Sequence, residues 1–136
     1  MAKVVAAHGA RHPELLEVRD CYEALRADLE PHLAKEERVL FPMIRELAGP
    51  PTDHQWAPVP QIPISRPVAV MRHEHDRAGE LLAELRRLTG GWALPADACA
   101  SYRALYTALA ELEADTHLHV HKENNILFPA VELLGA

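Results

Sequence analysis

The chain has 136 residues, of which 49% are hydrophobic and 25% charged, values typical of one soluble globular domain with a packed core. Its formal net charge of −6 argues against nucleic acid as the main partner, because phosphate binding needs a basic surface. No apolar run reaches the roughly 18 residues that a membrane span needs, and the N-terminus is too short and polar for a signal peptide. We therefore expect a cytoplasmic protein without a membrane segment.

The chain begins with a short helical pattern over residues 1–8, in which Val4, Val5 and His8 share one side. Gly9 predicts the end of this helix, and His12-Pro13 predicts a turn into the next one. The first element is too short to fill one position of a helical bundle by itself.

A long helical pattern follows over residues 14–41. Its apolar residues recur at alternating steps of three and four, which marks one face of a helix, and this stripe leads directly to His32 and Glu36. Both side chains therefore occupy positions that normally belong to core residues. Pro31 should bend the helix just before His32, and Pro42 should end the regular helix or kink it again, because proline lacks an amide hydrogen.

Residues 48–66 are rich in proline, and we expect them to cross the surface as an extended linker. The next helix is predicted over residues 67–89. His75 lies on its inward apolar stripe, whereas His73 lies on the solvated side.

The last helix is predicted to open near Pro95, after the break at Gly90-Gly91. Its apolar stripe runs through His119 and Glu123 to Ile126. The remaining polar side chains of interest fall on the solvated flank: His117, His121 and Glu113. No segment alternates with period two for long enough to predict a strand, so residues 1–136 are expected to form one all-α domain.

The two His/Glu pairs belong to a repeated segment. His32-Leu-Ala-Lys-Glu-Glu-Arg-Val-Leu-Phe-Pro42 and His119-Val-His-Lys-Glu-Asn-Asn-Ile-Leu-Phe-Pro129 share six of eleven positions. In each segment a histidine stands four residues before a glutamate, which places both side chains on one face of a helix, one turn apart.

Three helices thus bring ligand-type side chains to an apolar interior, which suits a pair of first-row transition metals. Iron is the first choice, and manganese or zinc are the alternatives. A hydrogen-bonded His/Glu network without metal is the structural alternative, although burial of unpaired carboxylates costs several kcal/mol. The ferritin-type Glu-x-x-His spacing and the zinc-protease pattern His-Glu-x-x-His are both absent.

These two segments, together with Glu74-His75-Asp-Arg-Ala-Gly79, resemble hemerythrin-type (HHE) cation-binding domains, and more narrowly the di-iron domain of iron–sulfur cluster repair proteins. The resemblance implies an antiparallel four-helix bundle around two non-haem iron ions bridged by oxygen and two carboxylates. Glu36 and Glu123 match the bridging carboxylates of that family. The matching terminal ligands are His8, His32, His75 and His119.

The resemblance also implies a further ligand histidine in the first helix, ahead of position 1, so we expect a shortened N-terminal helix. Three long helices would then leave an apolar groove, which a homodimer or an exchange of elements between chains would cover. The expected small ligands are O₂ and nitric oxide, and iron–sulfur proteins are expected partners.

The function implied by the resemblance is iron–sulfur cluster repair, or a response to nitric oxide and oxidants. A di-iron oxidase, peroxidase or nitric oxide reductase would need the same ligands, as would an oxygen-binding or sensing module. Whether the chain is an enzyme therefore stays open at this point. An interaction module without metal is the remaining alternative.

Overall fold

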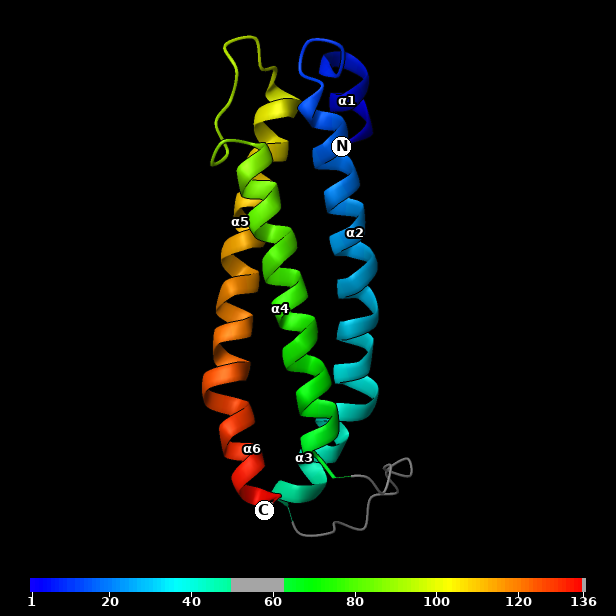
Figure 1. Ribbon diagram of the computed structural model, residues 1–136, viewed down its shortest axis with the longest axis vertical. Helices are drawn as coiled ribbons and strands as arrows, with labels where there is room; N and C mark the ends of the chain where they lie inside the picture. Colours follow the sequence, from blue (N-terminus) through cyan, green and yellow to red (C-terminus); the bar gives the residue numbers. More distant parts are fainter. Residues whose placement is uncertain (50–62, 136) are drawn as a thin grey trace.

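The computed structural model describes residues 1–49 and 63–135, and all regular structure in them is helical (Figure 1). These described residues form one short helix and three long helical rods. The short helix is α1 (Ala2–His8). The rods are formed by α2 (Glu14–Lys35), η1 (Glu36–Leu40) and α3 (Phe41–Ala48), by α4 (Ser65–Leu88), and by α5 (Ala100–Lys122), η2 (Glu123–Leu127) and α6 (Phe128–Leu134).

Neighbouring rods run in opposite directions, so the predicted all-α antiparallel bundle is confirmed, and its first helix, α1, spans 7 residues (Figure 1). The first rod continues beyond Pro42 to Ala48, in agreement with the predicted alternative of a kink. One predicted boundary needs correction, because α4 begins at Ser65, inside the predicted linker. The rest of that linker, residues 50–62, lies outside the described residues.

Each repeated segment contains a π-helical turn just before its proline. η1 begins at Glu36 and η2 at Glu123, and the amide of the following phenylalanine donates to the carbonyl of that glutamate, five residues back. Pro42 and Pro129 come next in the chain. A proline ring clashes with the carbonyl four residues before it, and the wider turn relieves this crowding without ending the helix.

The apolar core has two parts, one on each side of the buried polar residues. The first joins α2, α4 and α5 and includes Leu25, Leu82 and Tyr102. The second joins η1, α4 and α6 and includes Leu40, Met71 and Phe128. The buried side chains of His32, Glu36, His75 and Glu123 lie between these two apolar layers.

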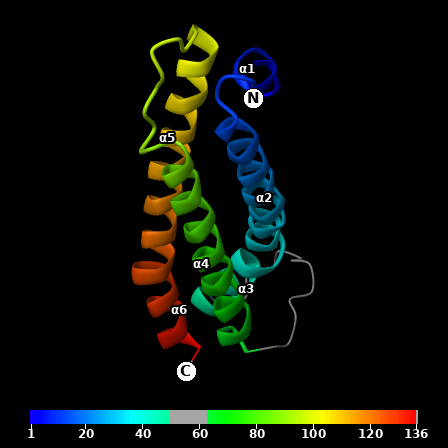
Figure 2. The ribbon, with the colours of Figure 1, turned by 45° about the horizontal axis from the view of Figure 1, so that its top comes forward.

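α2 packs along α4, whereas α1 bridges α2 and α5 only at the end of the bundle where the chain begins (Figure 2). Beyond α1, a groove lies between α2, α4 and α5. Its apolar lining includes Leu29, Leu33, Leu112 and Val120. Among the described residues, no helix combines the length and apolar composition that a membrane crossing requires.

Candidate metal centre

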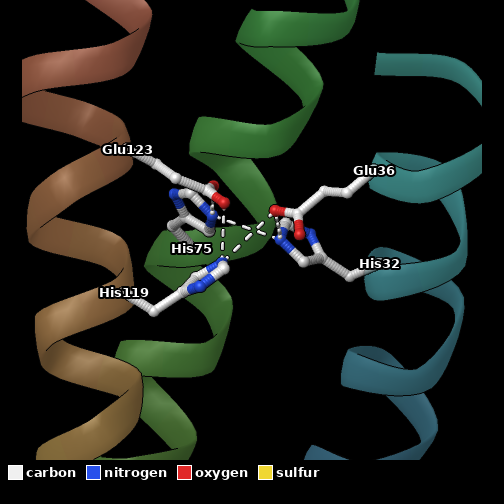
Figure 3. A group of neighbouring side chains, drawn as sticks. All are labelled: His32, Glu36, His75, His119 and Glu123. Atoms are coloured by element: carbon white, nitrogen blue, oxygen red, sulfur yellow. Dashed lines mark hydrogen bonds and ion pairs between the residues drawn. The ribbon is translucent and has the colours of Figure 1, made fainter. Parts of the chain in front are cut away.

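Five side chains from the three rods converge on one point inside the bundle (Figure 3). Each offers a ligand atom within 4.8 Å of every other. The five residues are His32, Glu36, His75, His119 and Glu123. The structure therefore brings together five of the six side chains that sequence analysis selected as metal ligands.

The five side chains form a closed ring of contacts through their Nε2 and carboxylate oxygen atoms (Figure 3). Glu36 Oε1 lies 2.9 Å from His32 Nε2 and 3.4 Å from His119 Nε2. Glu123 contacts His119 Nε2 at 2.7 Å through Oε1 and His75 Nε2 at 3.0 Å through Oε2. A distance of 3.2 Å between the Nε2 atoms of His75 and His32 completes the ring. We call these five residues the His/Glu ring.

Four members of the ring are almost completely buried, whereas the side chain of His119 keeps 41% of its surface exposed. His119 lines the groove, together with one face of His32 and of His75. Small molecules in the groove can therefore reach the ring from the side of His119.

Two members of the ring have shifted pKa values in the metal-free arrangement. Burial alone would raise the pKa of Glu36, but hydrogen bonds with His32 and Glu123 and nearby histidine charges outweigh burial and lower it to about 2. Burial alone would lower the pKa of His32, but the hydrogen bond with Glu36 and the charges of three carboxylates raise it. Both shifts favour the charged forms of these two side chains.

The donor set fits a metal cation. Glu123 Oε2 is buried and has no hydrogen-bond partner among the described residues, although His75 Nε2 lies 3.0 Å away. Such an orphaned carboxylate oxygen carries a free lone pair. Imidazole nitrogen and carboxylate oxygen together suit first-row transition metals, and a glutamate has two oxygens with which to bridge two ions.

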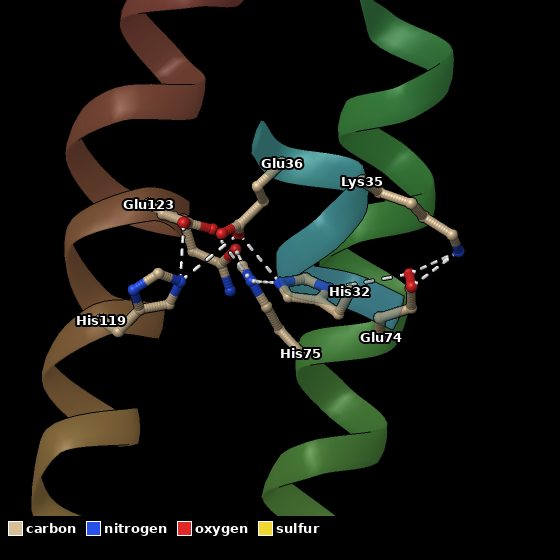
Figure 4. A network of polar contacts seen from close by, with 8 residues as sticks. His32, Lys35, Glu36, Glu74, His75, His119 and Glu123 are labelled. Atoms are coloured by element: carbon tan, nitrogen blue, oxygen red, sulfur yellow. Dashed lines mark hydrogen bonds and ion pairs between the residues drawn. The ribbon is translucent and has the colours of Figure 1, made fainter. Parts of the chain in front are cut away.

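A second layer of polar side chains surrounds the ring (Figure 4). Lys35 Nζ donates to Glu74 Oε1 at 2.9 Å, and Glu74 Oε2 lies 3.7 Å from His32 Nδ1. On the other side of the ring, His75 Nδ1 lies 2.8 Å from Asn124 Oδ1. Sequence analysis did not select Glu74 or Asn124, although each is directly adjacent in sequence to a member of the ring.

The structure does not bring His8 to the ring. His8 lies at the end of α1, where its ring packs edge-on against that of Tyr102 at a centroid distance of 5.1 Å. Tyr102 is in the first turn of α5, whereas His119 is in the last turn of that helix. His8 therefore lies at the opposite end of α5 from the ring.

Four side chains outside the ring were predicted to face solvent. The three histidines among them are exposed, whereas the glutamate is buried. His73 is exposed on α4, and His117 and His121 are exposed on α5. Glu113 was expected on the same solvated flank but is buried, because it accepts hydrogen bonds from Arg86 and Trp92.

The arrangement of the ring agrees with comparisons to known proteins. The domain model described as the hemerythrin HHE cation-binding domain matches residues 1–131. The chain belongs to the hemerythrin HHE cation-binding family. The predicted family resemblance and hemerythrin-like fold are thereby confirmed.

The hemerythrin-like chain is also similar to three bacterial proteins named for iron–sulfur cluster repair. It is 43% identical to the repair protein YtfE of Musicola paradisiaca over 75% of this chain and 40% of that protein. Identity with the repair protein ScdA of Staphylococcus haemolyticus is 34%, over 94% of this chain and 54% of the relative. A probable iron–sulfur cluster repair protein of Haemophilus influenzae is 40% identical, over 95% of this chain and 52% of that protein. The chain thus spans about half the length of the curated relatives it matches.

Proposed function

We propose that this hemerythrin-like chain binds two non-haem iron ions in the His/Glu ring and acts in iron–sulfur cluster repair or in the response to nitric oxide and oxidants. The observation that carries the proposal is the closed ring itself, in which three imidazole nitrogens and two carboxylates face one another in the core. The names of the relatives support the choice of cluster repair.

The proposed iron ligands are the five members of the ring, and His8 is left out because it lies at the far end of α5. Glu36 and Glu123 each contact two histidines and are therefore the groups placed to bridge two ions. Bound iron would supply redox chemistry and a position for a small ligand such as O₂ or nitric oxide. The protein residues would hold the iron, exclude bulk water and leave one approach past His119.

We also propose that a second copy of the chain covers the apolar groove. Leu33 lies on the groove and keeps 48% of its surface exposed, and Leu29, Leu112 and Val120 continue the apolar lining. A partner over these side chains would bury them and restrict access to the ring to small molecules. Iron–sulfur proteins with damaged clusters are the proposed further partners.

The proposal is tested by loading the chain with iron and measuring the metal and the ultraviolet–visible spectrum. The wild-type chain should retain about two iron ions and show the absorption of an oxo-bridged pair. Glu36→Gln should lose most of the iron, because an amide cannot bridge as a carboxylate does. Glu37→Gln is the matched control, since Glu37 is adjacent in sequence but exposed, and it should behave as wild type.

Fewer than about 0.3 iron ions per wild-type chain, without oxo-bridged absorption, would refute iron binding. Cluster repair is tested separately with an iron–sulfur enzyme inactivated by peroxide. The iron-loaded wild-type chain should restore its activity, and the Glu36→Gln chain should not. Equal recovery with both chains would contradict the repair role.

A further inference from the structure

Asn124 makes a specific contact with the His/Glu ring from outside it. Its Oδ1 atom lies 2.8 Å from Nδ1 of His75, a distance typical of a good hydrogen bond. Asn124 directly follows Glu123 in the π-helical turn η2, and it is half-buried. Glu123 contacts the other nitrogen of the same imidazole, Nε2. Two consecutive residues therefore contact the two nitrogens of one histidine.

This contact decides which nitrogen of His75 is free to bind a cation. A carbonyl oxygen can only accept a hydrogen bond, so Nδ1 of His75 must carry the hydrogen and donate it to Asn124 Oδ1. A neutral imidazole carries one hydrogen, and its other nitrogen then has a free lone pair. That nitrogen is Nε2, which faces the ring. Asn124 thus selects the form of His75 that can bind a metal.

Phe128 restricts the same imidazole in a second way. The rings of Phe128 and His75 are stacked, with centroids 5.9 Å apart and planes inclined by 4°. Stacking fixes the plane of the imidazole but still allows a flip of roughly 180° about the Cβ–Cγ bond, which exchanges the positions of ring nitrogen and ring carbon atoms. The hydrogen bond to Asn124 removes this freedom, because only one orientation places Nδ1 at Asn124.

Among the residues that the structure describes, the other two histidines of the ring have no equivalent bond at Nδ1. His32 Nδ1 is buried without a hydrogen-bond partner among the described residues, since Glu74 Oε2 lies 3.7 Å away. In the first repeated segment, Glu37 stands at the offset of Asn124 and is exposed. The two repeated segments therefore differ at the position where Asn124 contacts a histidine of another helix.

We propose that Asn124 is a positioning residue that holds His75 with Nδ1 protonated and Nε2 directed at the metal. The proposal rests on the proposed metal-binding function. Hydrogen bonds of this type from an outer residue to a metal-ligating histidine orient the ring and raise ligand basicity. Asn124 touches no metal position in this role and acts only through His75.

The first test is zinc affinity, measured by competition with a chromophoric chelator. Asn124→Leu should weaken zinc binding roughly 10- to 100-fold, because His75 loses its acceptor. Asn124→Asp retains an acceptor and should bind zinc within a few-fold of the wild-type affinity. Asn125→Leu is the matched control: Asn125 pairs with the exposed His121 at 3.1 Å, outside the ring, and its loss should leave zinc affinity unchanged.

The second test uses the metal-free chain and nuclear magnetic resonance of the histidine ring nitrogens. The Nδ1 hydrogen of His75 should exchange slowly with water in the wild-type, Asn124→Asp and Asn125→Leu chains, and rapidly in Asn124→Leu. Equal protection in Asn124→Leu, or a wild-type His75 without hydrogen on Nδ1, would overturn the proposal. Equal zinc affinities of wild type and Asn124→Leu would also overturn it. A wild-type chain that binds no zinc or iron would instead refute the metal-binding function, and the exchange measurement would still decide the role of Asn124.

Discussion

His32 and Glu36 stabilise each other as ions, and this fixes how the metal-free protein should respond to pH. The pKa of His32 is raised, so its ionic contribution to stability is complete below the unfolded pKa of about 6.5 and disappears as the pH rises through the folded pKa. The pKa of Glu36 is lowered to about 2, so its contribution is complete above about pH 4.3 and disappears as the pH falls towards 2. The ionic contribution of the pair to stability is therefore largest between about pH 4.3 and about pH 6.5.

For the metal-free chain, we predict a pH-dependent stability difference between wild type and His32→Asn. The difference in melting temperature should be larger near pH 5.5 than near pH 9, because the wild-type ion pair is lost at high pH. Thermal melts in the presence of a chelator measure it. A difference that is the same at both pH values would contradict the assignment of a charged His32.

The individual ring residues could be predicted from sequence because each lies on one of three apolar stripes, and four of them also belong to the repeated segment. His8 shows the limit of transfer by resemblance. His8 precedes α2, whereas His32 stands 18 residues beyond its first residue, Glu14, or about 27 Å along the helix axis. Sequence spacing within one helix fixes which side chains can meet, but it does not fix where a separate short helix packs. Asn124 and Glu74 were missed because their roles depend on contacts between rods.

The π-helical turn η2 explains why the helical periodicity of the sequence placed one residue of the last rod on the wrong face. In α4, which is a regular helix, His75 was predicted on the inward stripe and is buried. In the last rod, Ile126 was placed on the inward stripe but is 62% exposed, whereas Phe128 is fully buried. The wide turn η2 changes the angular step between residues, so a period of 3.6 no longer applies after Glu123.

A second cluster of polar side chains, separate from the His/Glu ring, links α4 to α5. Arg86 Nε donates to Glu113 Oε2 at 2.9 Å, and Nη2 of the same guanidinium contacts Oε1. Trp92 Nε1 also donates to Glu113, from the turn in which Gly90, Gly91 and Trp92 all have positive φ. The hydrogen bond with Arg86 lowers the pKa of Glu113 despite the opposing effect of burial.

Replacement of this carboxylate should therefore destabilise the fold without removing the metal ligands. We predict that Glu113→Gln lowers the melting temperature by about 3–6 °C at neutral pH. The matched control is Glu111→Gln at an exposed position of the same helix, which should change little. Because the lowered pKa makes the ionised form stabilising, the loss should shrink as the pH falls below about 4.3. A loss that stays constant down to pH 3 would contradict the charged pairing.

In the part of the chain that the structure describes, three long rods leave a groove beyond the end of α1. The groove opens onto His119, the most exposed member of the ring, so association over the groove and access to the proposed metal site are linked. A second copy would bury the apolar lining and close the ring against bulk water. The same contact would leave the far ends of the bundle free.

We predict a homodimer in solution, with twice the mass of the chain by light scattering at micromolar concentration. Leu33→Glu should produce monomers, because it places a charge on the groove. Leu133→Glu is the control, since Leu133 is exposed on α6 and does not line the groove. A wild-type chain that is a monomer at these concentrations would rule out coverage by a second copy.

Anomalous diffraction at the iron absorption edge, from crystals of the iron-loaded chain, determines the identity, number and ligands of the metal in one experiment. Two iron peaks should appear inside the ring, bridged by Glu36 and Glu123 and bound by His32, His75 and His119. Absence of iron from the ring, or iron peaks only at exposed histidines such as His117 and His121, would contradict a di-iron centre in this fold.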